Sequence, residues 1–175
     1  TPQTTGSAGT WTAGTLESAT HRLAITGRGA ISSLVDKARG NREFVRAVNG
    51  RVVNDLGAGA GTATLIDAGP VSATVRVVAS GPLAHTSEIT VYAESTRIDI
   101  ANRITQNFAD VRTWGFGLEL DTPDTWVEEV GALVRARLST DGGHYAPRNA
   151  RYDWLTLNHF AAMSGGGASI TLANA

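Results

Sequence analysis

The sequence predicts an all-β protein, folded as a large antiparallel β-sandwich with little helix. Apolar and polar residues alternate along several segments, most clearly over residues 71–78, 88–93 and 97–100. A period of two is typical of antiparallel strands that bury one face. Valine, isoleucine and threonine are frequent, and these residues suit a pleated sheet better than a helix. Glycine, proline, asparagine and aspartate separate the segments at about ten-residue spacing, as in sandwiches.

The composition excludes several other classes of protein. The chain has 175 residues, and its 42% hydrophobic content is too high for a disordered chain. No apolar run approaches the ~20 residues of a membrane-spanning helix. The 15 basic and 16 acidic residues leave a net charge of -1, which gives no field to attract nucleic acid or an anionic membrane. We therefore expect a soluble protein, either in a bacterial cytoplasm or secreted, with no nucleic-acid and no membrane partner.

The chain is expected to comprise a short linker and one domain. Residues 1–15 carry no ionisable side chain and no apolar periodicity, which predicts a linker or tag remnant. The β-sandwich domain is then expected to cover residues 16–175. Because the first residue is a threonine, we expect the chain to be a segment of a longer protein.

The first predicted elements form a hairpin followed by a helix. His21, Leu23 and Ile25 share one face of a strand, which residues 27–29 turn back on itself. Apolar residues at helical spacing predict a short helix over residues 41–48.

Strands are expected through the rest of the chain. Those beyond the three clearest segments are residues 114–120, 130–138, 154–163 and 168–172. The inner faces of the three clearest strands should be buried, namely Val75, Val77, Ile89, Val91, Ile98 and Ile100.

Few residues are arranged for catalysis. No two histidines lie at ligand spacing on one element, and cysteine is absent, so neither a metal site nor a thiol nucleophile is predicted. Glu128 and Glu129 are neighbours on a predicted strand, so they should point to opposite faces and not form a catalytic dyad. No catalytic residue is assigned to this segment.

A sugar site needs an aromatic platform and planar polar groups. The aromatic residues that could supply the platform are Trp114, Trp126, Tyr145, Tyr152 and Trp154, of which Trp114 alternates like a core residue. Only the segment from Asp141 to Trp154 combines aromatic and ionisable residues with the composition of a loop. Its candidate substrate-binding residues are Asp141, His144, Tyr145, Arg148, Asp153 and Trp154. The alternative is that Trp154 begins a core strand and Arg148 pairs with Asp153 for structural reasons.

One stretch of the chain is similar to a known family. Residues 16–37 resemble the opening hairpin of the C-terminal β-sandwich region of glycoside hydrolase family 38 α-mannosidases. Residues 69–77, 89–92, 97–104 and 159–174 resemble later strands of that region in the same order. The matching positions of the hairpin are Leu16, Glu17, Arg22, Leu23, Ile25, Gly29, Ile31, Ser33, Leu34, Asp36 and Lys37.

The resemblance implies a galactose mutarotase-like fold and a role beside a catalytic domain. The family carries its zinc site and nucleophile in an α/β barrel that precedes the sandwich, and nothing in this sequence matches that barrel. Residues 105–108 also lack the Trp-x-Glu element that usually follows the central strand of the family. No cofactor is expected in this segment, since zinc would belong to the barrel.

Three functions remain open from the sequence. The first is an accessory carbohydrate-associated domain of an α-mannosidase-like glycoside hydrolase, whose partners are that enzyme's catalytic domain and carbohydrate, including mannose-containing carbohydrate. The second is a free-standing carbohydrate-binding module. The third is a mutarotase-like sugar epimerase, which would use His144 with Asp141, Asp153 or Glu129 as acid and base. Whether the chain is itself an enzyme is left undecided.

Overall fold

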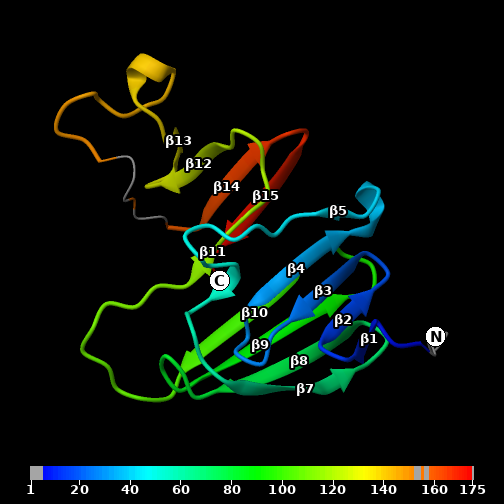
Figure 1. Cartoon of the computed structure of the whole chain (residues 1–175). Helices are drawn as coiled ribbons and strands as arrows, with labels where there is room; N and C mark the ends of the chain where they lie inside the picture. Colours follow the sequence, from blue (N-terminus) through cyan, green and yellow to red (C-terminus); the bar gives the residue numbers. More distant parts are fainter. Residues whose placement is uncertain (1–5, 152–154, 156–157, 175) are drawn as a thin grey trace. The chain divides into compact units, whose positions relative to one another are not determined.

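A computed structural model describes residues 6–151, 155 and 158–174 of the chain (Figure 1). The described residues form fifteen strands and two short 3-10 helices, η1 (Lys37–Arg39) and η2 (Ser139–Asp141). All pairings between the named strands are antiparallel. The all-β prediction is therefore confirmed. Neither of these helices is long and apolar enough to span a membrane.

The chain divides into two compact units, Thr1–Glu119 and Leu120–Ala175. The sequence predicts a single domain over residues 16–175, whereas the structure shows a division after Glu119. Unit 1 contains two sheets and unit 2 contains one.

The first sheet of unit 1 follows the chain order closely. Its path is β1-β2-β3-β4-β6-β11, and β5 pairs with β4. These strands are β1 (Gly9–Thr12), β2 (Thr15–Ser18), β3 (His21–Ile25), β4 (Ile31–Asp36), β5 (Arg42–Glu43), β6 (Val53–Asp55) and β11 (Gly115–Phe116). The predicted hairpin of residues 21–35 is present as β3 and β4. Residues 9–12 pair with β2, so they belong to the sheet, and the expected linker over residues 1–15 is wrong for this strand.

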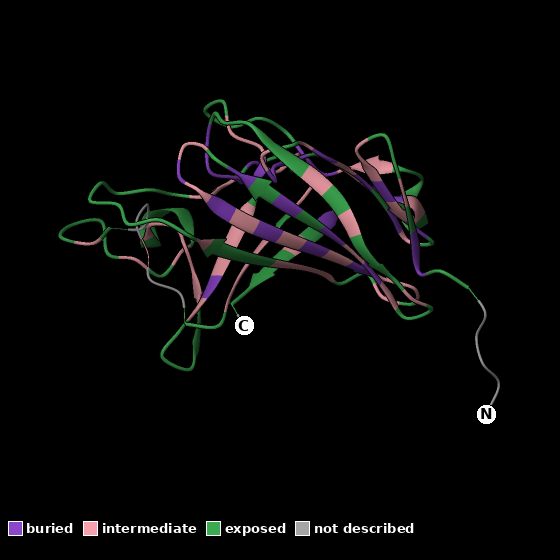
Figure 2. Ribbon diagram, turned by 90° about the horizontal axis from the view of Figure 1, so that it is seen from below, coloured by how far each residue is buried: buried purple, intermediate pink, exposed green. Residues whose placement is uncertain are grey.

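The second sheet of unit 1 is a four-stranded meander. It comprises β7 (Gly61–Ala68), β8 (Ser72–Ala79), β9 (His85–Tyr92) and β10 (Ile98–Ile104), in the order β10-β9-β8-β7. Figure 2 shows the alternation of buried and exposed residues as bands of colour along the strands.

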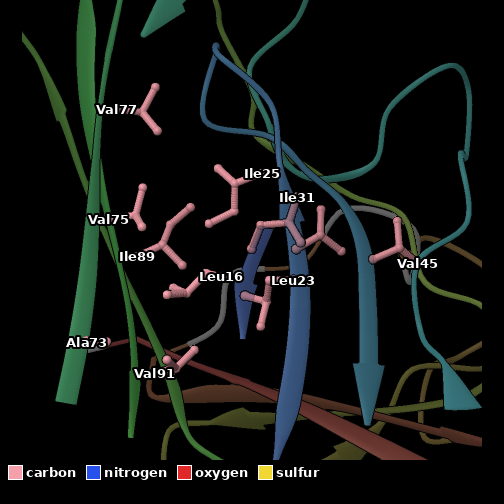
Figure 3. Close-up of a cluster of buried hydrophobic side chains, with 11 residues drawn as sticks. Leu16, Leu23, Ile25, Ile31, Val45, Ala73, Val75, Val77, Ile89 and Val91 are labelled. Carbon is pink, nitrogen blue, oxygen red and sulfur yellow. The ribbon is translucent and has the colours of Figure 1, made fainter. Parts of the chain in front are cut away.

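The core of unit 1 lies between its two sheets. Leu16, Leu23 and Ile31 from the first sheet are at most 1% exposed, as are Val75 and Ile89 from the second. Figure 3 shows the two sets of side chains facing each other across the gap between the sheets. This arrangement is a two-layer β-sandwich.

The predicted inner faces are confirmed for β8 and β9 and are less buried on β10. Val75, Val77, Ile89 and Val91 are all buried, as the alternation predicts. Ile98 and Ile100 pack against the same core but are only partly buried. The physical reason is that β10 is an edge strand, with a neighbour on one side alone.

The predicted helix over residues 41–48 is wrong. Arg42 and Glu43 instead form β5, which pairs with β4. The Glu43 carboxylate accepts hydrogen bonds from the backbone N–H groups of Leu34 (2.8 Å), Phe44 (3.0 Å) and Val45 (2.8 Å). The backbone donors of this segment are therefore satisfied by a side chain and by a neighbouring strand.

The predicted strand over residues 114–120 is mostly loop. Only Gly115 and Phe116 form a strand, β11, and Leu118 makes an isolated bridge with Val45. Alternation alone therefore overestimates the length of this strand.

Unit 2 contains one antiparallel sheet in the order β13-β12-β14-β15. Its strands are β12 (Asp124–Glu129), β13 (Ala132–Arg135), β14 (Phe160–Gly165) and β15 (Ala168–Ala173). The predicted strand over residues 130–138 begins too early, because Val130 and Gly131 form the turn between β12 and β13. The predicted strand over residues 154–163 is seen as β14, which begins at Phe160; residues 152–154 and 156–157 lie outside the described residues.

Candidate functional site

Within unit 2, an aromatic and charged cluster forms around Trp126. Trp126 lies on β12, between Asp124 and Glu128 on the same face of the strand, because side chains alternate along it. The hairpin register places Arg135 of β13 directly opposite Trp126. The guanidinium carbon of Arg135 lies 6.0 Å from the centroid of the Trp126 ring. Trp126 is only half-buried, so part of its ring faces solvent.

Asp124 connects the members of this cluster. Arg135 Nε donates to both carboxylate oxygens of Asp124, at 2.8 and 3.0 Å. Trp126 Nε1 donates to Oδ2 of the same carboxylate at 3.1 Å, and Arg137 Nε lies 3.3 Å from Oδ1. The hydrogen bond from Arg135 is the main cause that lowers the pKa of Asp124 below its usual value. Asp124 is therefore an ionised acceptor at neutral pH.

His144 packs on the edge of this cluster. Its ring meets the Trp126 ring edge to face, with centroids 5.8 Å apart. The backbone N–H of Arg135 donates to His144 Nδ1 at 2.7 Å. Because Nδ1 accepts this hydrogen bond, the ring proton of neutral His144 lies on Nε2, which is then a donor without a free lone pair. His144 is thus arranged to donate a hydrogen bond and not to act as a base.

Tyr145 lies beside His144 but points to a different partner. Its hydroxyl donates to Oε2 of Glu129 at 3.2 Å. Burial is the main cause that raises the pKa of Tyr145, and the Glu129 carboxylate adds to it. Tyr145 therefore stays protonated at neutral pH.

The loop that carries His144 and Tyr145 is tightly built. Tyr145 N–H donates to the carbonyl oxygen of Arg137 at 3.0 Å, and Ser139 N–H donates to that of Tyr145 at 2.7 Å. A β-carbon at Gly143 would lie 2.1 Å from the Arg137 carbonyl oxygen, so only glycine fits there. The short loop closure holds His144 in place against β13.

The structure brings one of the predicted site residues, His144, into the cluster around Trp126. Tyr145 follows it in the loop, but its hydroxyl binds Glu129, which alternation places on the other face of β12. Asp141 is an exposed residue in η2, and Arg148 is exposed beyond it. No described residue makes a contact with either of these two side chains that would place it in the cluster. Asp153 and Trp154 lie outside the described residues.

Sequence reasoning missed three charged members of the cluster, Asp124, Arg135 and Arg137. A signal for Asp124 and Arg135 exists in the hairpin sequence. With the turn placed at Val130-Gly131, antiparallel register sets Arg135 opposite Trp126, and alternation sets Asp124 on the same face. The incorrect strand over residues 130–138 concealed this register.

Glu128 and Glu129 have separate partners. Glu128 Oε2 lies 2.8 Å from Nδ1 of the exposed His159. Its Oε1 accepts from Gly131 N–H at 2.7 Å, and this hydrogen bond is the largest cause of its lowered pKa. Glu129 contacts Tyr145 instead, so the two carboxylates do not act as a pair.

The cluster around Trp126 has the chemistry of a shallow recognition site. Among the described residues, no group of three or more histidine, cysteine, aspartate or glutamate side chains is placed to hold a metal ion. No protein-family model and no curated protein matches the chain. The arrangement offers the half-buried Trp126 ring, the ionised Asp124 carboxylate as acceptor, and N–H donors from a guanidinium and an imidazole.

Proposed function

We propose that the chain is an accessory carbohydrate-associated β-sandwich of an α-mannosidase-like glycoside hydrolase, and that it contacts sugar through the cluster around Trp126. The observation that carries the sugar-binding part is the half-buried Trp126 ring with Asp124 and Arg135 beside it. The resemblance of residues 16–37 to the opening hairpin of the family 38 sandwich supports the link to an α-mannosidase.

The Trp126 ring would contact the apolar face of a pyranose. Aromatic rings bind such faces through apolar contact, and planar polar groups beside them fix the positions of the sugar hydroxyls. Asp124 accepts hydrogen bonds, while Arg135 and Nε2 of His144 donate them. Both kinds of partner that a hydroxyl needs are thus present within one face of the hairpin.

Binding by this cluster alone should be weak. Most hydrogen-bonding capacity of Asp124 and Arg135 is already used within the cluster. One stacking face and a few exposed hydrogen bonds support an affinity on the order of millimolar. This is the behaviour of a domain that assists a catalytic partner, to which the proposal assigns both the zinc site and the nucleophile.

An epimerase function receives no support from this geometry. A base is needed for proton transfer, and His144 uses its Nδ1 lone pair to accept the Arg135 N–H. Among its described candidate partners, Asp141 and Glu129 make no hydrogen bond to His144. The site is better suited to hold a sugar than to move its protons.

The test is a titration of mannobiose into the isotopically labelled 175-residue chain, followed by amide chemical shifts. We expect shifts in β12, β13 and residues 136–145, and we expect Trp126→Ala to abolish them. Phe108→Ala is the matched control, because Phe108 is a half-exposed aromatic residue in unit 1. The proposal is overturned if the shifts persist in Trp126→Ala, or if mannobiose near 50 mM, well above a millimolar dissociation constant, shifts no residue of the cluster.

A further inference from the structure

The outer face of the second sheet of unit 1 contains an open hollow of about 520 Å³. It lies over three neighbouring strands, β8, β9 and β10. Two rows of paired residues form its floor: Arg76, Glu88 and Ala101 in one row, and Val78, Thr86 and Arg103 in the next. These side chains point away from the core, because the residues between them, such as Val77 and Ser87, are buried.

The charges in this hollow do not cancel. Arg76 is paired with Glu88, with its Nε and Nη2 each 2.8 Å from Oε1. Arg103 is exposed, and its guanidinium has no hydrogen-bond or ion-pair partner among the described residues. Two guanidinium groups therefore face one carboxylate. The excess positive charge and the five N–H donors of Arg103 suit a carboxylate on a ligand.

The rest of the hollow suits a sugar ring. Val78 is 57% exposed and lies in the same row as Arg103, with Thr86 between them, so it gives an apolar contact beside the unpaired guanidinium. Thr86 and Thr105 add hydroxyl groups, and the Glu88 carboxylate can accept hydrogen bonds from sugar hydroxyls. A second hollow continues from Arg103 along Gln106 and Asn107, so the surface extends beyond a single ring.

We infer that this hollow binds an acidic oligosaccharide, in which Arg103 pairs with the carboxylate of a uronate residue. The Val78 side chain contacts the ring, and the open continuation past Arg103 accommodates the next sugar. An acidic peptide offers carboxylates as well, but it lacks the array of ring hydroxyls that Thr86, Thr105 and Glu88 can bind. The inference does not depend on the proposed function, since every residue of the hollow belongs to unit 1 and the Trp126 cluster belongs to unit 2.

The test is a titration of a galacturonate trimer into the labelled 175-residue chain at low ionic strength. We expect shifts in β8, β9 and β10, a weaker affinity at higher salt, and a loss of about tenfold or more in Arg103→Gln. Arg22→Gln is the matched control: it removes the same charge from an exposed position on β3, in the other sheet of the sandwich. It should leave the affinity unchanged.

Each result decides for or against this inference. A trimer affinity that falls equally in Arg22→Gln and Arg103→Gln overturns it, as does the absence of any shift in β8 to β10. A triglutamate peptide that binds as tightly as the trimer also overturns it, because the surface then recognises carboxylates without sugar. A failure here leaves the mannobiose titration unaffected, since that experiment is read from the amides of unit 2.

Discussion

Arg28 and Asp55 form a two-point ion pair within unit 1, with Arg28 Nε 3.2 Å from Oδ1 and Nη2 3.0 Å from Oδ2. The same carboxylate accepts backbone N–H groups from Val52 at 3.3 Å and Gly57 at 2.9 Å. Asp55 is 1% exposed. The pair therefore connects the β3–β4 turn, which carries Arg28, to β6, which carries Asp55. Both oxygens of the buried carboxylate have hydrogen-bond partners.

Asp55→Asn should destabilise the protein by about 3 kcal/mol at pH 7, because it leaves Arg28 without its charged partner. Burial acts to raise the pKa of Asp55, but the hydrogen bonds from Arg28, Val52 and Gly57 outweigh it, and the net shift is downward. A carboxyl group whose pKa is lower in the folded state stabilises the protein above its unfolded pKa of about 4 and loses that effect as pH falls through the folded value. Urea unfolding should be measured at about pH 7 and at about pH 2.5, on either side of that range. The difference in the free energy of unfolding between wild type and variant should be smaller at the lower pH.

The control for this prediction is Glu88→Gln. Its partner, Arg76, is about half exposed, so the loss should be at most about 1 kcal/mol. Equal losses in the two variants would show that burial does not set the strength of the Asp55 pair.

Val130→Asn should stabilise unit 2. Val130 and Gly131 form a two-residue turn with φ angles of 49° and 81°, and a β-branched residue is strained in that region. Asn-Gly is the favoured pair for such a hairpin turn, so we expect a gain of about 1 kcal/mol. Hydrogen exchange of the β12 and β13 amides should slow by about fivefold. Val130→Ala is the control, since it keeps the unfavourable backbone angle; a similar gain there would contradict the explanation.

Ile89→Ala and Ile98→Ala should differ in their cost. Ile89 is completely buried between the sheets, and its truncation should destabilise unit 1 by about 3–4 kcal/mol. Ile98 lies on the edge strand and is only partly buried, so its truncation should cost about half as much. Chemical denaturation of the two variants measures both values, and a greater loss for Ile98→Ala would contradict the edge position of β10.

The 175-residue chain should not hydrolyse an aryl α-mannoside. The resemblance places the zinc site and the nucleophile of the family in a barrel to which nothing in this sequence corresponds. Added zinc should change neither the melting temperature nor the activity. Turnover that survives repurification and is lost in His144→Ala would contradict this prediction and would favour the epimerase hypothesis.

The sequence by itself determined the fold class and which side chains of the central strands face inward. Alternation correctly predicted Val75, Val77 and Ile89 as core residues, since the period of two depends only on local strand geometry. It also located the hairpin of β3 and β4. It predicted His144 and Tyr145 as candidate site residues, and whether they bind sugar is for the mannobiose titration to decide.

The tertiary structure alone decided which strands are neighbours and which lie at an edge. Ile98 alternates as Ile89 does, but it is less buried because β10 has a partner on one side only. Residues 41–48 have the spacing of a helix, but the Glu43 carboxylate binds three backbone N–H groups of the segment and of β4. Arg135 meets Asp124 and Trp126 only through the register of a hairpin whose turn lies at Val130-Gly131. Periodicity reports the side of a strand on which a residue lies, whereas the partner across the sheet depends on where the chain turns, and this information is not local.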